Sequence, residues 1–196
     1  MKVDIKDVKK LKELAGVGLT DAKQALEAAD GNFDKALEAM REKGLTKAEK
    51  RGDRETRSGL VDAYVHDSRI GAILELNCET DFVAKTPEFK ELAHYIAMQI
   101  ASMNPIYVSM TDVPEDQVKK VRDDAESEVG DKPAEIKAKI VDGKVAKHFE
   151  DKVLLTQKYI LDDTKTVEEF IKTYVAKTGE NISVRQFKRI ELGVTE

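Results

Sequence analysis

The sequence predicts an α+β fold: a three-helix bundle followed by a small antiparallel sheet packed with helices and a projecting helical hairpin. Three observations lead to this prediction. Apolar residues recur at helical spacing through residues 4–44. Beyond Gly59 the apolar period changes to two, which is typical of strands. At about residues 115–151, two charged segments with helical spacing meet between Gly130 and Pro133, which favours a helical hairpin.

The first segment predicts three short helices around a thin core rich in alanine. Asp4, Thr20 and Asn32 can each cap the start of a helix, because their side-chain oxygens accept hydrogen bonds from free backbone N–H groups. Gly44 is expected to end the third helix in the left-handed conformation. A bundle this small is marginally stable alone, so we expect it to serve as a docking module. The apolar stripe of the first helix comprises Ile5, Val8, Leu11, Leu14 and Ala15.

The chain divides into three predicted parts. Residues 1–45 form the helical docking domain, residues 46–57 a charged linker, and residues 58–196 an α+β core that includes the helical hairpin. From Lys43 to Arg57, six basic side chains are mixed with three acidic ones. So mixed a run favours a solvated joint between domains over a phosphate-binding segment.

The core is expected to begin with a β-hairpin over residues 61–78. Val61, Ala63 and Val65 alternate with more polar neighbours, as the residues of a strand do. The second strand keeps its apolar residues on one face through to Cys78. Residues 66–69 between the two strands have the composition of a turn.

A long helix and a final strand are expected after the hairpin. Thr86 can cap the helix, and Pro87 can open it, since a proline at the first helical position loses no hydrogen bond. The final strand is predicted over residues 181–192. Its apolar parity shifts between Val184 and Phe187, which a β-bulge would explain.

Composition excludes several classes of function. Of the 196 residues 36% are charged, and the net charge of −5 argues against a nucleic-acid binder, whose surface carries a concentrated basic face. No apolar run approaches the ~20 residues that a membrane span needs, and the first residues lack the pattern of a signal peptide. A single cysteine fits a reducing compartment. We expect a cytoplasmic protein with no direct nucleic-acid or membrane partner.

The sequence carries no convincing catalytic or cofactor motif. Walker spacing for nucleotide phosphates is absent, the three histidines are isolated, and one cysteine cannot supply a cysteine-rich zinc site. Cys78 is a conceivable thiol nucleophile, but its parity puts it on the apolar face of its strand, where a buried and inert cysteine is expected. We therefore expect no catalytic residue, metal or cofactor, and no enzyme.

One stretch is unusual, because Thr80-Asp81-Phe82-Val83 places an anion beside a large apolar ring between a buried strand and a capped helix. Two interpretations are open. In the first, which the residue pattern alone favours, Phe82 folds back into the core and Asp81 satisfies the backbone of the turn. In the second, the rigid flanks hold Phe82 outward as a wedge that enters a partner's core at little ordering cost.

The eleven residues from Glu75 to Lys85, Glu-Leu-Asn-Cys-Glu-Thr-Asp-Phe-Val-Ala-Lys, resemble the hallmark segment of the bacterial elongation factor Ts family. The run from Leu11 to Leu26 is similar to the family's other signature. Residues 132–136 (Lys-Pro-Ala-Glu-Ile) and 180–182 (Glu-Asn-Ile) also match, so the resemblance covers nearly the whole chain.

The chain departs from the family pattern at four positions near its start. Lys12 and Ala15 stand where the family usually has Arg and Thr. Leu19 and Thr20 stand where it has two methionines that touch the partner GTPase. The chain is also similar to the short form of the family, which has one copy of the core unit.

The resemblance implies a guanine-nucleotide exchange factor, with no catalytic chemistry of its own, that binds elongation factor Tu carrying GDP. The loop of Thr80, Asp81, Phe82 and Val83 would push the phenylalanine ring between helices of the partner near the phosphates, dislocate Mg²⁺, and release GDP in exchange for GTP. The short form resembles members that work as homodimers, with the strands after residue 180 a candidate interface. The N-terminal residues expected to dock on the nucleotide-binding domain are Leu11, Val17, Gly18, Leu19 and Thr20.

Two rival interpretations belong to other classes. The three-helix start also resembles ubiquitin-associated domains, which favours a general adaptor. An adaptor predicts that residues 1–50 alone carry the binding activity, whereas exchange needs residues 75–85 as well. A small hydrolase using Cys78 is the other alternative, and it requires fast alkylation of the thiol in the native protein.

Overall fold

The computed structural model describes residues 3–15, 18–49, 51–130 and 133–194, with the side chains at 13, 41 and 43–49 outside the description. The α+β class is confirmed: helices accompany a small antiparallel sheet of three strands. The chain forms two compact units, each assembled from several segments. The first comprises Met1–Leu60, Leu76–Leu92 and Glu169–Ser183, and the second comprises Val61–Glu75, Ala93–Glu168 and Val184–Glu196.

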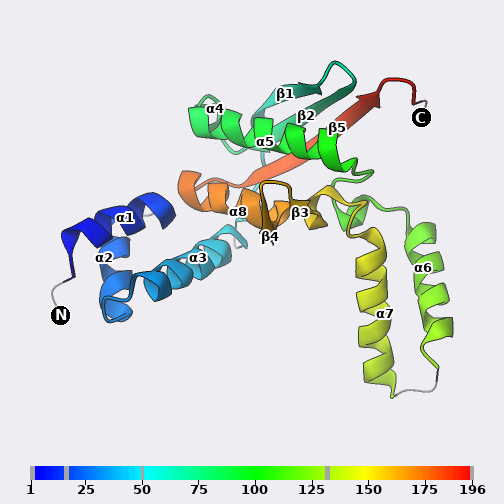
Figure 1. Ribbon diagram of the computed structural model, residues 1–196, viewed down its shortest axis with the longest axis horizontal. Helices are drawn as coiled ribbons and strands as arrows, with labels where there is room; N and C mark the ends of the chain where they lie inside the picture. The colour runs from blue at the N-terminus through cyan, green and yellow to red at the C-terminus, as the bar shows by residue number, and fades with distance from the viewer. Residues whose placement is uncertain (1–2, 16–17, 50, 131–132, 195–196) are drawn as a thin grey trace. The chain divides into compact units, whose positions relative to one another are not determined.

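The N-terminal part of the first unit is a bundle of α1 (Ile5–Ala15), α2 (Leu19–Ala28) and α3 (Phe33–Glu49), in which each helix contacts the other two (Figure 1). Its ubiquitin-associated likeness stays a prediction. The stripe predicted for α1 is too wide, because Ile5 and Leu14 are exposed. The bundle core consists of Val8, Leu11, Ala22, Leu26, Ala36 and Met40.

Two of the three predicted caps in this bundle are confirmed. The Lys6 N–H donates to the Asp4 carboxylate at 2.9 Å, and the Lys35 N–H donates to Asn32 Oδ1 at 3.0 Å. The predicted cap at Thr20 is wrong, because α2 begins at Leu19, with Gly18 at its N-cap position and no side-chain cap.

The predicted helix stop at Gly44 is also wrong. Helix α3 continues through this residue to Glu49, into the first part of the predicted linker. A glycine inside a helix costs only about 1 kcal/mol relative to alanine, so it marks a possible end and does not force one. The domain limits at residues 45 and 57 stay a prediction.

The end of the predicted linker is exposed over residues 52–55, and polar contacts attach it to the core. The Asn181 side-chain amide donates to the backbone carbonyls of Gly52 at 3.1 Å and Arg54 at 2.8 Å. The hydroxyls of Thr56 and Ser183 share a hydrogen bond of 2.8 Å. Residues 52–56 are therefore fixed by polar contacts that the mixed charge of the segment did not indicate.

The central sheet has the strand order β1 (Ser58–His66), β2 (Ile70–Cys78) and β5 (Ile182–Glu191). The predicted turn of the hairpin is confirmed, with Asp67 and Ser68 both at positive φ. Along β5, more buried and more exposed residues alternate except at Arg185 and Gln186, which are both exposed. This break lies between Val184 and Phe187, where the sequence predicted the shift in the apolar pattern.

Helix α5 (Pro87–Met103) begins at the predicted cap, because the Phe89 N–H donates to Thr86 Oγ1 at 3.2 Å. Within the second unit, α5 contacts one face of the sheet. His94 Nδ1 lies 3.2 Å from the Asp62 carboxylate of β1, and Arg189 Nε of β5 donates to the Ala101 carbonyl at 3.1 Å. The other face of these strands carries Val61, Ala63, Val65, Ile73 and Ile190, all exposed.

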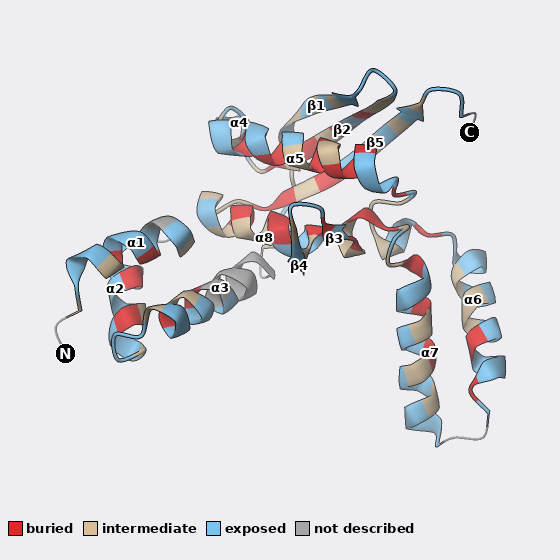
Figure 2. Ribbon diagram, in the orientation of Figure 1, coloured by how far each residue is buried: buried red, intermediate tan, exposed pale blue. Residues whose placement is uncertain are grey.

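The predicted helical hairpin is confirmed as α6 (Glu115–Glu128) and α7 (Ala134–Phe149), which run side by side (Figure 1). Figure 2 shows the buried positions of α7 recurring along the helix between exposed ones, as a narrow apolar stripe requires. The buried residues of this hairpin and the segments beside it are Val113, Ala125, Val129, Val141, Val145, Phe149 and Val153.

Short elements that the sequence analysis missed connect the hairpin to the rest of the second unit. They are the 3₁₀ turns η1 (Met110–Asp112) and η2 (Leu154–Thr156) and the paired strands β3 (Lys158–Tyr159) and β4 (Asp162–Thr166). Tyr107 and Val153 form a single parallel bridge outside these strands. Helix α8 (Val167–Thr178) follows β4 and ends before Gly179, which has a φ of 78°.

A buried amide pair secures these short elements. Gln99 Nε2 donates to Gln157 Oε1 at 3.1 Å and to the Lys158 carbonyl at 3.0 Å, and Gln99 Oε1 accepts the Ile160 N–H at 2.8 Å. Because both glutamines are almost fully buried, these bonds satisfy groups that would otherwise be costly to remove from water.

Candidate partner-binding site

The segment Thr80–Val83 is a short helical turn and not an irregular loop. Residues Asp81–Ala84 form α4, with Thr80 in an extended conformation at the N-cap and its hydroxyl oxygen accepting from the Val83 N–H at 3.5 Å. Thr80 therefore caps the turn. A threonine at this position can cap because its oxygen reaches the N–H of the third residue of the helix.

Phe82 projects from this turn and is 80% exposed. The interpretation that folds the ring back into its own core is therefore wrong. On the same turn, Ala84 is buried and Val83 is half-buried, so one side of α4 rests on the protein while the ring faces solvent. Leaving a phenylalanine in water forgoes about 1.5–3 kcal/mol of burial free energy, which is available to a partner that covers it.

Asp81 is ionised and paired beside the exposed ring. Lys85 Nζ donates to Asp81 Oδ2 at 2.6 Å, one helical turn along the chain. This hydrogen bond and the charge of the lysine lower the pKa of the Asp81 carboxyl. Both side chains are exposed, so the pair adds little to stability and mainly fixes where the negative charge lies.

Cys78 contacts the turn from the protein interior. Its side chain is fully buried, and Sγ donates to the Thr80 carbonyl at 3.1 Å. Burial, with a smaller contribution from the Glu180 charge, raises the pKa of the Cys78 thiol from 9.0 to about 11. Because the thiolate is the nucleophile, this environment argues against the hydrolase alternative.

The predicted docking residues of the bundle do not share one environment. Gly18, Leu19 and Thr20 are exposed at the start of α2, and Leu19 is 54% exposed. Leu11 is fully buried in the bundle core, so it can only support such a surface from within. Val17 lies outside the described residues. Leu14 was predicted to lie on the buried face of the first helix, but it is exposed. Its apolar side chain could not indicate this exposure from the sequence.

Two of the three histidines lie close to the same tyrosine ring. The Tyr64 ring lies 6.0 Å from the His66 ring and 5.6 Å from the His94 ring, measured between centroids. The Tyr64 hydroxyl is 2.9 Å from His66 Nδ1. The sequence could not show this cluster, because His94 comes from a helix packed on the strand. Among the described residues no group of three or more His, Cys, Asp or Glu side chains could hold a metal ion.

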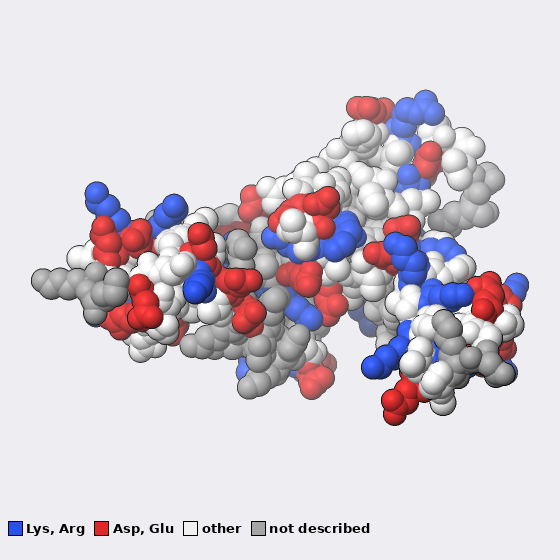
Figure 3. All heavy atoms as spheres, turned by 60° about the horizontal axis from the view of Figure 1, so that its bottom comes forward, with Lys and Arg blue, Asp and Glu red and all other residues white. Residues whose placement is uncertain are grey.

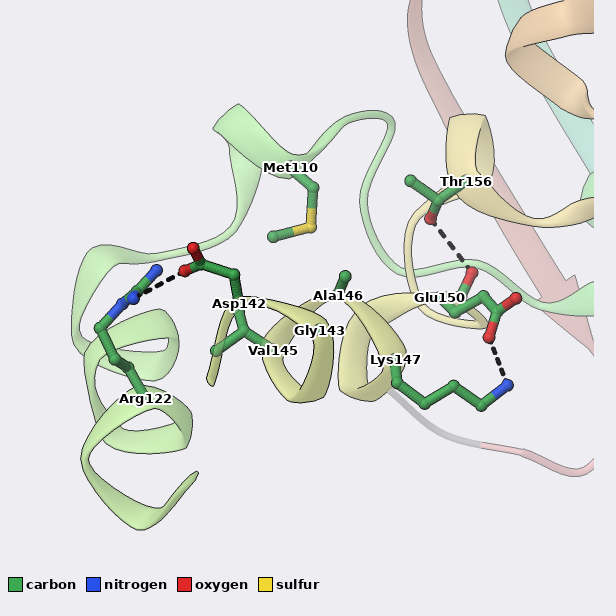
Figure 4. A pocket seen from close by; sticks show the side chains of 9 residues that line it. All are labelled: Met110, Arg122, Asp142, Gly143, Val145, Ala146, Lys147, Glu150 and Thr156. Carbon is green, nitrogen blue, oxygen red and sulfur yellow. Dashed lines mark hydrogen bonds and ion pairs between the residues drawn. The ribbon is translucent and has the colours of Figure 1, made fainter. Parts of the chain in front are cut away.

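An open groove of about 490 Å³ lies beside the helical hairpin (Figure 4). Its charged side chains are paired: Arg122 with Asp142 at 2.8 Å, and Lys147 with Glu150. The groove presents no nucleophile and no cluster of unpaired cations, so it offers no chemistry beyond general binding. The remaining lining residues are Met110, Gly143, Val145, Ala146 and Thr156.

Acidic and basic side chains are interspersed over the face shown in Figure 3, as the composition indicates. None of the helices in the described part of the chain is both long and apolar enough to cross a membrane. Exposed large apolar side chains on this surface include the ring of Phe82 and, on the outer face of the sheet, Val61, Ile73 and Ile190.

Comparison with known proteins gives one consistent result. The family model described as "Elongation factor TS" matches residues 2–194. Elongation factor Ts of Thermotoga petrophila and that of Thermotoga maritima are each 49% identical over 194 residues, covering 98% of this chain and 98% of the relative. Elongation factor Ts of Thermodesulfovibrio yellowstonii is 44% identical over 197 residues, covering 100% of this chain and 99% of the relative.

Proposed function

This chain belongs to the elongation factor Ts family, the nucleotide exchange factors of elongation factor Tu, and we propose that it exchanges nucleotide by inserting the Thr80–Val83 turn beside the partner's bound GDP. The N-terminal bundle binds the nucleotide-binding domain, and the inserted turn disturbs the Mg²⁺ and phosphate site. GDP then leaves and GTP takes its place. The protein acts in the cytoplasm, with no catalytic chemistry and no cofactor of its own.

The exposed ring of Phe82 is the observation that carries this proposal. A wedge must lie outside its own core and must be held stiffly, because a mobile side chain would lose conformational entropy on insertion. Phe82 meets the first condition with 80% exposure, and the capped turn between a strand and a long helix meets the second. An adaptor that binds only through its N-terminal helices has no need of either feature.

Asp81 adds an electrostatic contribution. A carboxylate brought close to bound phosphates is repelled by them and attracts the cation that they hold, and both effects destabilise the Mg²⁺ complex. Asp81 is charged at neutral pH, as an ordinary aspartate is, and Lys85 favours the ionised form further by lowering the pKa of Asp81. Lys85 also balances the charge while the factor is free in solution.

Exchange requires differential binding. A factor that prefers the nucleotide-free partner lowers the affinity of the partner for nucleotide by the same ratio. Burying one phenylalanine side chain is worth about 1.5–3 kcal/mol, and 1.4 kcal/mol corresponds to tenfold, so Phe82 supplies roughly ten- to hundredfold. The remainder of the coupling comes from the docking contacts, among which the exposed Leu19 is a candidate.

We further propose that the chain forms a homodimer through the outer face of its sheet. Helix α5 covers one face, and the other presents exposed β-branched side chains from all three strands, including Val61, Ile73 and Ile190. A second copy supplies a face of the same shape and character, as a two-fold interface requires. Beyond β5, Leu192 extends the apolar surface in the region after residue 180.

The release of fluorescent GDP from elongation factor Tu tests the proposed function. A small amount of the factor, well below the concentration of the GTPase, is expected to accelerate the release of all the bound nucleotide, because each molecule acts repeatedly. Binding without acceleration would support the adaptor alternative instead. The assay should be repeated over a range of factor concentrations to separate the maximal rate from the concentration that gives half of it.

A further inference from the structure

Two dipeptides, Glu79-Thr80 and Glu180-Asn181, are joined by a reciprocal exchange of hydrogen bonds. The Glu180 carboxylate accepts the Thr80 N–H at 2.9 Å and the Thr80 hydroxyl at 2.6 Å. In return, the Glu79 carboxylate accepts the Asn181 N–H at 2.7 Å. We call these four residues, Glu79, Thr80, Glu180 and Asn181, the Glu180 clasp.

The clasp determines the direction of the Thr80 hydroxyl. A threonine hydroxyl has one hydrogen to donate and two lone pairs to accept with. Because the hydrogen goes to Glu180 Oε1, the lone pairs are free to face the Val83 N–H, which is the capping contact of α4. Glu180 thereby selects the hydroxyl orientation that starts the helical turn carrying Phe82.

Thr80 is held on both sides of its backbone. Its N–H is bound by Glu180, and its carbonyl accepts the Cys78 thiol at 3.1 Å. A helix of four residues has too few internal hydrogen bonds to be stable alone, so its orientation depends on such anchors. With Thr80 fixed, the position of Phe82 two residues later is fixed as well.

The opposite side of the clasp is equally well supported. Asn181 is buried, and its side-chain amide donates to the carbonyls of Gly52 and Arg54. Arg54 also lies 3.5 Å from the Glu79 carboxylate, where it offsets part of the negative charge that two neighbouring glutamates bring. Glu180 follows Gly179, whose positive φ turns the chain directly after α8. The carboxylate therefore extends from a fixed backbone.

We propose that Glu180 is a positioning residue for nucleotide exchange, which acts by holding Thr80 and thereby the orientation in which Phe82 is presented to the partner. The inference rests on the proposed function, since it concerns the same wedge. Hydrogen bonds to a charged carboxylate are stronger than neutral ones, so this acceptor resists the force that insertion places on the turn. A purely structural clasp would stabilise the fold without a specific link to Phe82.

A double-mutant cycle distinguishes the two roles. Glu180→Ala, Phe82→Ala and the combined variant are compared with the unchanged chain for the maximal rate of GDP release and for the half-saturating concentration. Glu180→Ala is expected to lower the maximal rate about tenfold, from the loss of charge-assisted hydrogen bonds, with little change in the half-saturating concentration. On the Phe82→Ala background, Glu180→Ala should lower the maximal rate hardly any further, because both substitutions remove the same interaction of the Phe82 ring with the partner.

Glu180→Gln and Glu126→Ala complete the set. The glutamine keeps one acceptor oxygen for Thr80, so its maximal rate should lie between those of Glu180→Ala and the unchanged chain. Glu126 is an exposed glutamate of α6 outside the clasp, and its removal should leave the rate unchanged. If Glu180→Ala does not fold, the cycle is made with Glu180→Gln, in which a lowered rate that vanishes on the Phe82→Ala background supports the inference.

The outcomes separate this inference from the proposed function. If Phe82→Ala leaves the maximal rate of GDP release unchanged, the proposed insertion of Phe82 into the partner is wrong. If Phe82→Ala slows release but neither Glu180 variant does, or if their losses simply add, the wedge stands and the positioning role of Glu180 is overturned. A higher half-saturating concentration with an unchanged maximal rate also overturns it, since it would assign Glu180 to docking.

Discussion

Phe82 and Phe89 are seven residues apart, and Phe82 is 80% exposed while Phe89 is fully buried. Phe89 belongs to the first turns of α5 and faces the core, whereas Phe82 lies on the short turn before it and faces solvent. A phenylalanine side chain thus packs in the core at position 89, whereas at position 82 it is available to a partner.

Alanine substitution of the two phenylalanines should separate these roles in stability. Phe89→Ala is expected to lower the free energy of unfolding by about 3–5 kcal/mol, because it leaves a cavity in a packed core. Phe82→Ala should change it by less than about 0.5 kcal/mol, as is usual for exposed positions. Denaturant unfolding measures both, and a large loss in Phe82→Ala would show that the ring packs inside its own subunit.

Removing Lys85 should raise the pKa of Asp81. The lysine favours the ionised carboxylate, so Lys85→Ala is expected to move the pKa of Asp81 upward toward the ordinary 3.8. An NMR titration of the Asp81 side-chain carboxyl carbon follows this shift. Lys90→Ala, which removes an exposed lysine of α5, serves as the control. An equal shift in both variants would mean that Asp81 responds only to the general charge of the surface.

Cys78 should make stability depend on pH above 9. The folded thiol has a pKa of about 11 and the unfolded thiol about 9.0, so the folded chain keeps this proton where the unfolded chain loses it. The thiol therefore makes its full contribution to the free energy of unfolding below pH 9. As the pH rises from 9 toward 11, that contribution falls by up to about 1.4 kcal/mol per pH unit.

Comparison with Cys78→Ala isolates this contribution. The difference in unfolding free energy between the two chains should shrink steadily from pH 9 to pH 11. A difference that stays constant over this range would show that the folded thiol ionises normally. Slow alkylation of the native thiol at pH 8, against fast alkylation of the unfolded chain, is expected for the same reason.

The proposed homodimer can be tested on the central strand of the sheet. Ile73→Lys puts a charge on the apolar outer face and should convert the dimer to a monomer in sedimentation velocity, because burying an unpaired ammonium is costly. Ile136→Lys is a matched control, since Ile136 is an isoleucine of α7 with 50% exposure against 47% for Ile73. A monomeric unchanged chain, or dissociation by both variants, would contradict this interface.

Local signals predicted much of the fold. The caps at Asp4, Asn32 and Thr86 were identified because a cap is made within three residues of sequence. The predicted cap at Thr20 and the predicted helix end at Gly44 were wrong, because a threonine or a glycine is also tolerated inside a helix. There the neighbouring residues decide whether the helix continues. The pair β3 and β4 was missed, since strands this short show no period.

Features that depend on contacts between residues far apart in the chain could not be predicted from the sequence. Alternation grouped Val61 with Val65 on one face of β1 but could not say which face α5 covers. The pairing of Thr80 with Glu180 spans 100 residues, and neither residue type signals it. For Phe82, the residue pattern alone favoured burial, and only the family resemblance indicated an exposed wedge.

The rate of GDP release from elongation factor Tu at saturating factor tests the central claim most directly. Saturation removes differences in docking, so Phe82→Ala then reports only on what the ring does once the complex has formed. The account predicts release roughly ten- to hundredfold slower than with the unchanged chain, from the burial free energy of one phenylalanine. An unchanged rate at saturation would contradict it.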